Sequence, residues 1–426
     1  MAKATIDAAT GCLRLDGQKV FPLILSDAPP QNGKTPQGND AWAEIANDGR
    51  GANFIRSGRS LAHPWKLAEI DAQIAEEHAR LDLAQQHHMY GWLRLVNAAN
   101  LPAPTAGATS EPEQLLVKIA TALKDHPALA VYKGADEPQH GKTPPGGLVR
   151  AREKLGSVDA DHPLVIIQAP LGAVADLAPY AKACHITGAD IYPISYGHVH
   201  ATDMPNKDIS VVGDVTRKMV AAANGKPVWM TLQIAWSGVI PSHDDPDRVP
   251  RFPSLHDLRF MSYQAIIAGA RGLAFFGGDY TQVMAPRDAV TGWNWTFWRL
   301  VLRPLLEELT SGATLPALLA PAAKTTLASS VTDVEVVTRR AGSALYVIAV
   351  RRSATKTDQV HFSGLPHRDD GTPLNAGEVV SEYAQDPPSP PVQASKQKFR
   401  YVKVANVGFT DWLGPHDARV YRFHLA

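Results

Sequence analysis

Residues 129–139 read LAVYKGADEPQ, an apolar run that ends abruptly at two adjacent carboxylates, Asp136 and Glu137, and a proline. A short apolar run of this kind is typical of a β-strand that is buried on both faces. Unpaired carboxylates are rarely buried, so packing alone does not explain two of them at the end of such a strand. The stretch is either a surface turn or the rim of a functional site, and the rest of the chain decides between the two.

Seven more apolar runs of this type lie between Gln18 and about Gly312, and amphipathic patterns separate them. The seven runs are residues 20–26, 52–58, 91–99, 163–170, 189–195, 227–236 and 271–278. The segment 110–127 is typical of the intervening patterns, since Ser110 and Pro112 are helix-start residues and Lys124 suits a last turn. Eight strand–helix alternations over about 290 residues predict an α/β fold, the (β/α)8 TIM barrel. The competing fold is an open doubly wound sheet, which usually begins with a glycine-rich phosphate loop, and SDAPPQNGK at 26–34 is unlike one.

The sequence changes character after Gly312. The Ala- and Pro-rich segment PALLAPAAKTT, 316–326, is predicted to be a linker. Alternating apolar and polar runs follow it, with turn signals roughly every 10–15 residues, which indicates an antiparallel β-sandwich. We therefore predict a barrel domain at 1–315 and a small antiparallel β-sandwich domain at 325–426.

Composition excludes some classes of function. Of the 426 residues, 42 are Lys or Arg and 42 are Asp or Glu, so the formal net charge is zero. Nucleic acid is not expected as a partner, because phosphate binding needs a basic excess or patch. No apolar run approaches the roughly 18 residues of a membrane span, and the first residues lack the apolar core of a signal peptide. The two cysteines, Cys12 and Cys184, form neither a disulfide framework nor a zinc site.

Polar and aromatic residues follow the predicted barrel strands where each strand ends. In barrels of this type the reactive groups lie at the carboxyl ends of the strands. Packing alone would not require such residues at nearly every strand end, so together they predict a site. These residues are Asp27, Arg56, Asn97, Asp136, Glu137, Gln168, Asp190, Tyr192, Gln233, Trp236 and Asp279.

Several short motifs, in this order along the chain, resemble a clan A glycoside hydrolase barrel. The motifs are GANFIR at 51–56, DEP at 136–138, DIYP at 190–193, PVWMTLQ at 227–233 and GARGLAFFGG at 269–278. The tail VGFTDWLGPHDARVYRF, 407–423, is similar to the last strands of the β-sandwich that often follows such barrels. In this family the general acid is a Glu followed by Pro after strand four, and Glu137 with Pro138 matches it.

The resemblance implies cleavage of glycosidic bonds in a poly- or oligosaccharide, with Glu137 as general acid. It implies a carbohydrate substrate and no cofactor, and it assigns no metal. The strand-end residues other than Asp136, Glu137 and Asp190 would then bind the sugar. We expect a secreted or periplasmic protein, with a cytoplasmic location as the alternative, while the oligomeric state stays open.

The departure from the family lies at strand seven, where the nucleophilic Glu is replaced by Gln233. A carboxamide is neither a carboxylate nucleophile nor a base. Asp190 is our first choice for the second carboxylate and Asp279 the next. Strands four and six are not adjacent, so we expect room for a water between Glu137 and Asp190, as in inverting enzymes. Asp136 beside Glu137 would raise the pKa of one carboxyl and keep an acid protonated.

Other interpretations stay open. The missing strand-seven Glu also fits a barrel that binds carbohydrate without cleaving it. His198, His200 and Asp203 have a spacing that suits a metal, which would fit a metal-dependent hydrolase. An Asp-Glu pair after strand four also resembles the acetamido-sugar hydrolases that use substrate-assisted catalysis.

Two basic residues and several tryptophans have more than one possible role. Arg56 is either a sugar ligand or a salt-bridge partner of Asp136 or Glu137. Lys133 either forms a Schiff base or pairs and packs within its strand. Five tryptophans are either sugar platforms or core residues: Trp65, Trp229, Trp236, Trp293 and Trp295.

Overall fold

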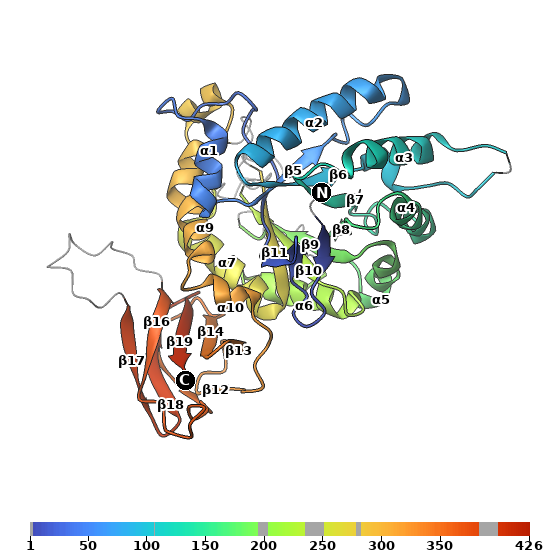
Figure 1. Ribbon diagram of the computed structural model, residues 1–426. Coiled ribbons are helices and arrows are strands. Elements are labelled where there is room, and N and C mark those ends of the chain that lie inside the picture. Colours follow the sequence, from blue (N-terminus) through green and yellow to red (C-terminus); the bar gives the residue numbers. More distant parts are fainter. Residues whose placement is uncertain (1–2, 106, 195–202, 235–250, 278–282, 383–398) are drawn as a thin grey trace.

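The computed structural model describes residues 3–105, 107–194, 203–234, 251–277, 283–382 and 399–426. A barrel surrounded by helices lies beside a smaller all-β unit (Figure 1). No helix within these described ranges combines the length and apolar character that crossing a membrane requires.

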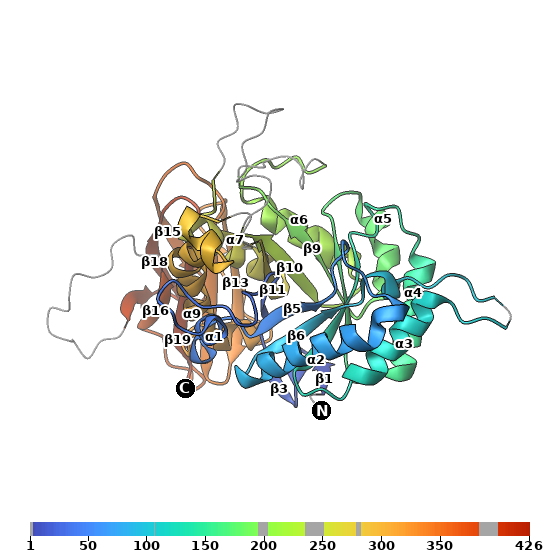
Figure 2. The same ribbon diagram turned by 90° about the horizontal axis from the view of Figure 1, so that it is seen from above.

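Eight parallel strands close into a barrel, as the sequence predicts (Figure 2). The strands are β4 (Leu23–Leu25), β5 (Phe54–Gly58), β6 (Tyr90–Arg94), β7 (Leu129–Asp136), β8 (Leu164–Gln168), β9 (Ile186–Ile191), β10 (Val228–Gln233) and β11 (Ala270–Phe276). Each strand pairs with the next along the chain, and β11 returns to β4 to close the ring. All carboxyl ends therefore meet at one mouth of the barrel.

Helices cover the outside of the barrel. They are α1 (Ala41–Ala46), α2 (Ile70–Gln86), α3 (Glu111–Leu123), α4 (Pro145–Val158), α5 (Val174–Leu177), α6 (Val211–Ala222), α7 (Leu255–Ala268), α8 (Trp295–Phe297) and α9 (Arg303–Thr310). Ser110 is the N-cap residue of α3, as predicted. The hydroxyl of Ser254 accepts a hydrogen bond from the Asp257 N–H and caps α7, which ends at Gly269 in the left-handed region.

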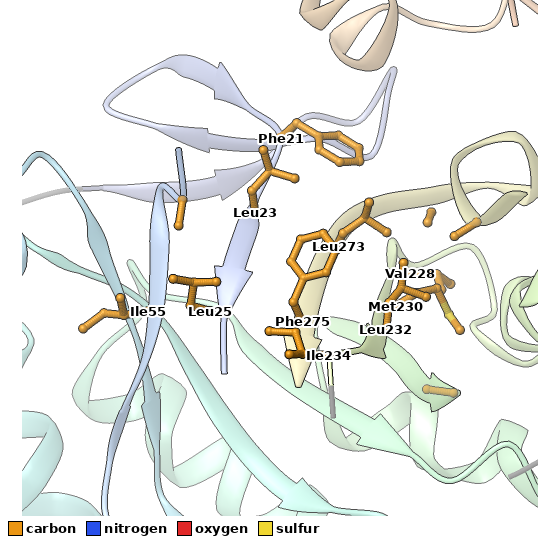
Figure 3. Packing of buried hydrophobic residues seen from close by; sticks show 14 of the residues in the cluster. Phe21, Leu23, Leu25, Ile55, Val228, Met230, Leu232, Ile234, Leu273 and Phe275 are labelled. Atoms are coloured by element: carbon orange, nitrogen blue, oxygen red, sulfur yellow. The ribbon is translucent and has the colours of Figure 1, made fainter. Parts of the chain in front are cut away.

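Alternation along the strands separates two apolar layers. Leu23 and Leu25 of β4 face the helices, where they join Met230 and Phe275 of the neighbouring strands β10 and β11 (Figure 3). Ile24, between them in sequence, faces the barrel interior instead. Because side chains of a strand alternate between faces, this pattern fixes which residues point into the barrel.

A small antiparallel sheet that the sequence did not predict precedes the barrel. Its strands are β1 (Ala4–Ile6), β2 (Leu13–Leu15) and β3 (Gln18–Val20). Leu13 and Leu15 belong to the same apolar cluster as Ile24 and Trp229 of the barrel interior. The sheet therefore covers the end of the barrel opposite the mouth.

The C-terminal unit is an antiparallel β-sandwich, as predicted. Its strands are β12 (Ala328–Ser329), β13 (Val334–Ala341), β14 (Ala344–Arg351), β15 (Asp358–Ser363), β16 (Ala376–Glu382), β17 (Arg400–Ala405), β18 (Gly408–Leu413) and β19 (Ala418–His424). Strand β17 pairs with both β16 and β18 and so joins the two halves of the sandwich. Side chains from both halves form one apolar cluster.

The predicted linker at 316–326 is partly helical. Residues Leu315–Leu319 form α10, in which Ala317 and Leu318 are buried. Pro316 lies in the first turn of this helix, where it costs no hydrogen bond, and Ala and Leu are strong helix formers. The segment therefore packs as part of the core rather than acting as a spacer.

Candidate active site

A pocket of about 330 Å³ opens at the carboxyl ends of the barrel strands. Both carboxylates of the DEP motif and Asp190 line it together, so the structure brings together the three predicted catalytic residues. The lining residues are Ser26, Arg56, Trp92, Lys133, Asp136, Glu137, His140, Ile167, Ala169, Leu171, Asp190, Tyr192, Thr231 and Phe276.

An irregularity in β7 turns Asp136 and Glu137 toward the same pocket. Successive side chains of a regular strand point to opposite faces, but the register of β7 against β8 shifts between Lys133 and Asp136. Glu137 follows with φ of 42°, in the left-handed region, and its N–H donates to the Ile167 carbonyl at 2.8 Å. A non-glycine residue in this region is strained, which is a common property of functional sites.

Lys133 and Asp136, which both line the pocket, form a salt bridge. The Lys133 ammonium is buried and also lies 5.6 Å from the centre of the Trp92 ring. Burial opposes ionisation of Asp136, yet the charges of Lys133 and Arg56 outweigh it and hold the pKa of Asp136 below its ordinary value. Asp136 therefore stays ionised. Lys133 pairs and packs, as one of its two interpretations predicted.

The side chains of Glu137 and Asp190 line the same pocket, close enough for their carboxyl groups to interact directly. Burial, and then the neighbouring charge of Glu137, raise the pKa of Asp190 well above its ordinary value. Two carboxyls in contact cannot both ionise readily, so the pair holds a proton at neutral pH. The expected gap for a water between Glu137 and Asp190 is not present, because β9 directs Asp190 inward, directly against the turn after β7.

Aromatic and cationic side chains form the wall of the pocket. The rings of Tyr192 and Phe276 stack with centroids 5.5 Å apart, and the Arg56 guanidinium lies 5.4 Å from the Phe276 centroid. Burial raises the pKa of the Tyr192 hydroxyl well above its ordinary value. Arg56 forms its salt bridge with Asp27, at 3.0 Å, rather than with Asp136 or Glu137. Asp27 lies outside this pocket and lines an adjoining one.

Gln233 has a structural role in place of the predicted sugar contact. Its side chain is fully buried. Its Oε1 accepts from the Ile194 N–H and its Nε2 donates to the Ile194 carbonyl, both at 2.9 Å. A carboxamide offers both an acceptor and a donor, whereas a carboxylate offers acceptors alone. This pairing explains Gln at the strand-seven position.

Asn97 and Gln168, two further predicted sugar ligands, also bind main chain. The Asn97 side chain accepts from the Trp65 N–H at 3.1 Å and donates to the Trp65 carbonyl at 2.9 Å. Gln168 is buried, and its Oε1 accepts from the Gln139 N–H at 3.2 Å. Neither residue lines the pocket. Gln168 instead supports the turn that carries Glu137.

Some predicted residues fall in segments that the structure does not describe. Trp236, Asp279, His198 and His200 lie outside the described residues. Asp203, the third residue of the predicted metal motif, bonds Lys218 at 2.8 Å. Four of the five tryptophans considered as platforms are buried core residues: Trp65, Trp229, Trp293 and Trp295.

Among the described residues, one group of side chains has metal-ligand geometry, and it lies outside the pocket. Asp82 of α2 bonds the rings of His78 and His126, each at 3.1 Å. His126 lies just before β7 begins, so the group is at the end of the barrel opposite the mouth. The pocket residues form no such group within the described ranges.

Sequence reasoning missed several residues of the pocket wall. Strand β6 ends at Arg94, three residues before the predicted end at Asn97, so the inward-pointing Trp92 was overlooked. His140 comes from the turn after Glu137, and Phe276 from the aromatic pair that ends β11.

Solved structures resemble this chain, whereas comparisons of its sequence found no match. No protein-family model matches the chain, and no match was found among curated proteins. A family 5 glycoside hydrolase from Bacteroides vulgatus has a similar structure, with a TM-score of 0.64 and 12% identity, over 99% of this chain and 92% of that one. The chain has the fold of barrel glycoside hydrolases.

Two further similar structures differ in the activity that their names state. One is a family 30 endoxylanase from Clostridium papyrosolvens, with a TM-score of 0.53 and 12% identity, over 99% of this chain and all of that one. The other is an alpha-amylase from Geobacillus thermoleovorans, with a TM-score of 0.51 and 12% identity, over 95% of this chain and 98% of that one. Both are similar along almost their whole length. The fold by itself therefore does not select a substrate.

Proposed function

We propose that this protein is a glycoside hydrolase that cleaves a glycosidic bond in an oligo- or polysaccharide. The observation that carries the proposal is that Glu137 and the buried Asp190 lie together in one pocket at the mouth of the barrel. Cleavage of a glycosidic bond needs a carboxylic acid that protonates the leaving oxygen, and a second carboxylate that faces the positive charge at the anomeric carbon.

Glu137 delivers the proton in this proposal, and Asp190 supplies it. Asp190 is the more deeply buried partner and its raised pKa keeps a proton in the pair at neutral pH. Glu137 is the partially exposed partner. The proton passes to the glycosidic oxygen as the bond to the anomeric carbon breaks. A water then adds its hydroxide to that carbon and returns its proton to the pair, which restores the starting state.

Asp136 is the second carboxylate in this proposal, in place of Asp190. It lines the same pocket, and its salt bridge with Lys133 keeps it ionised. An ionised carboxylate stabilises the positive charge of the oxocarbenium-like transition state. Tyr192 and Phe276 provide aromatic surface, which suits the C–H faces of a sugar ring.

The test compares Glu137→Gln with the wild-type protein on a broad panel of polysaccharides and aryl glycosides. We expect kcat on natural glycans to fall by about 10²–10⁴-fold, the usual contribution of general acid catalysis. Aryl glycosides whose leaving group needs no protonation should lose less activity. Glu153→Gln, at an exposed position of α4, is the matched control and should retain full activity. Undiminished glycan cleavage by Glu137→Gln would overturn the proposal.

A second candidate function is carbohydrate binding without cleavage. The observation that favours it is Gln233, which removes the carboxylate that the family places on strand seven and bonds the main chain instead. Calorimetry that detects sugar binding, together with the absence of any product after long incubation with wild-type protein, would support this function against hydrolysis.

A further inference from the structure

A second pocket, of about 300 Å³, adjoins the candidate active site and shares Ser26 and Arg56 with it. Three arginines and one carboxylate line this second pocket: Arg56, Arg80, Arg94 and Asp27. We call it the arginine pocket. Arg56 belongs to β5, Arg94 ends the neighbouring strand β6, Arg80 lies on α2 and Asp27 follows β4. The pocket is therefore built by consecutive units of the barrel.

The remaining wall of the arginine pocket is held in place by two buried tryptophans. Trp293 donates its indole N–H to the Asp27 carbonyl at 2.8 Å, and Trp42 donates to the Pro30 carbonyl at 3.2 Å. All four residues line the pocket. The pocket is thus formed before any ligand binds, which lowers the cost of binding.

Positive charge exceeds negative charge among the side chains that line the arginine pocket. Asp27 neutralises Arg56 through their salt bridge. Within the described part of the chain, neither Arg80 nor Arg94 has an ion-pair partner. The Nε atoms of Arg56 and Arg94 are also buried, and no hydrogen-bond acceptor for them lies within the described residues.

One more acid lies close to these arginines, but it compensates them poorly. The Glu77 carboxylate is buried and accepts the Gly58 N–H at 2.9 Å. Burial raises the pKa of Glu77, which weakens it as a counter-charge. Burial, and then the like charge of Arg56, lower the pKa of Arg94 to about 10, so the crowding of the cations has an electrostatic cost. An anionic ligand would offset that cost.

We propose that the arginine pocket binds the anionic group of an acidic sugar, so that the substrate of the candidate active site is an acidic glycan. This inference rests on the proposed function and specifies its substrate class. A guanidinium fork matches the planar oxygens of a carboxylate and also binds a sulfate. Because Arg56 lines both pockets, a sugar whose anionic group binds in the arginine pocket places its glycosidic bond next to Glu137.

Binding is tested first, separately from cleavage, by calorimetry on the Glu137→Gln protein. The probes are oligosaccharides of uronic acids, the same oligosaccharides after chemical reduction of their carboxyl groups, and sulfated neutral oligosaccharides. We expect at least one acidic class to bind about tenfold or more tightly than its neutral counterpart, as charged hydrogen bonds typically give. The uronate and sulfate arms tell which anion is recognised.

Variants then test whether the arginine pocket causes the preference for acidic ligands. Arg94→Gln and Arg80→Gln, each in the Glu137→Gln background, should abolish the preference for the acidic ligand. Arg80→Gln provides a second test of this preference if Arg94→Gln does not fold. Arg340→Gln is the matched control, since Arg340 lies in the sandwich and pairs with Asp369 at 2.8 Å, so that the preference should survive it.

The outcomes separate this inference from the proposed function. Equal affinity for acidic and carboxyl-reduced oligosaccharides, or a preference that both arginine variants retain, would overturn the inference. Selective binding of an acidic oligosaccharide that wild-type protein never cleaves would support the arginine pocket and contradict hydrolysis. Cleavage of neutral glycans alone would support hydrolysis and contradict the pocket.

Discussion

Asp190 differs from an ordinary surface carboxyl in both its burial and its neighbours. Its side chain lies inside the barrel, 8% exposed, and shares its pocket with Glu137. The environment of Asp136, from the same turn as Glu137, instead stabilises the ionised form, because Lys133 contacts it. One pocket therefore holds a carboxyl that keeps its proton, Asp190, and a carboxylate that stays ionised, Asp136. Such a division of pKa values is how one site provides both acid and carboxylate.

Asp190→Asn should make the stability of the protein less dependent on pH. Above the ordinary value of 3.8 the unfolded chain loses this proton while the native protein keeps it. The wild-type free energy of unfolding therefore falls by about 1.4 kcal/mol per pH unit as pH rises toward the raised pKa. Asn does not titrate, so the variant avoids this loss.

Urea unfolding of both proteins from pH 4 to pH 8 measures this difference. The stability of Asp190→Asn relative to wild type should grow with pH. Asp71→Asn, at an exposed position of α2, serves as control and should follow the wild-type curve. Parallel curves for Asp190→Asn and wild type would show that Asp190 is ionised at neutral pH.

At the scale of elements, the segments that follow the barrel strands are fixed by side chains bonded to main chain. Gln233 at the end of β10 holds Ile194 after β9, and Asn97 after β6 holds Trp65 after β5. Each carboxamide uses both its donor and its acceptor. The strand ends thus carry supporting residues as well as reactive ones.

Gln233→Glu restores the carboxylate of the family motif, but we expect it to damage the fold rather than create a nucleophile. The Ile194 carbonyl would lose its donor, and a carboxylate would be buried. A loss of about 1–3 kcal/mol in the free energy of unfolding is expected. Thermal and urea unfolding, with Gln359→Glu on an exposed position of β15 as control, measure it. An active variant of unchanged stability would refute this role for Gln233.

At the scale of the whole molecule, the barrel and the sandwich share a core. Side chains of β14, among them Ile348 and Val350, belong to the same apolar cluster as Phe260 of α7. A buried polar network also crosses the boundary through Arg259 of α7. Its guanidinium binds Glu308 of α9 at 2.8 Å, the Ala418 carbonyl at 2.8 Å and the Ser381 hydroxyl at 2.7 Å. The two units therefore stabilise one another.

Arg259→Met should weaken both units together. Glu308 would lose its cation while remaining partly buried, and two sandwich acceptors would lose their donor. Removing one partner of a buried pair costs about 3–5 kcal/mol, and the lower end applies because Glu308 is partly exposed. Arg340→Met, which breaks an exposed pair, should cost less than about 1 kcal/mol. Equal unfolding midpoints for the two variants would contradict the role of Arg259.

The sequence by itself determined the architecture and the location of the candidate site. Eight apolar runs separated by amphipathic ones specify a barrel, because each strand is buried on both faces and has to be covered by a helix. The DEP motif at the end of the fourth run located Glu137 and Asp136, and the DIYP motif located Asp190. These features are local in the chain, so periodicity and strand ends were sufficient to find them.

Tertiary structure alone decided which role each of these residues has. Whether an amide at a strand end binds sugar or main chain depends on a partner far away in sequence, as Gln233 and Ile194 show. Whether a carboxyl keeps its proton depends on burial and on which charges the fold brings near it. The same holds for the arginine pocket, where Arg80 and Arg94 become neighbours only when α2 packs beside β6. Electrostatic environment is a property of position in space, and sequence order does not encode it locally.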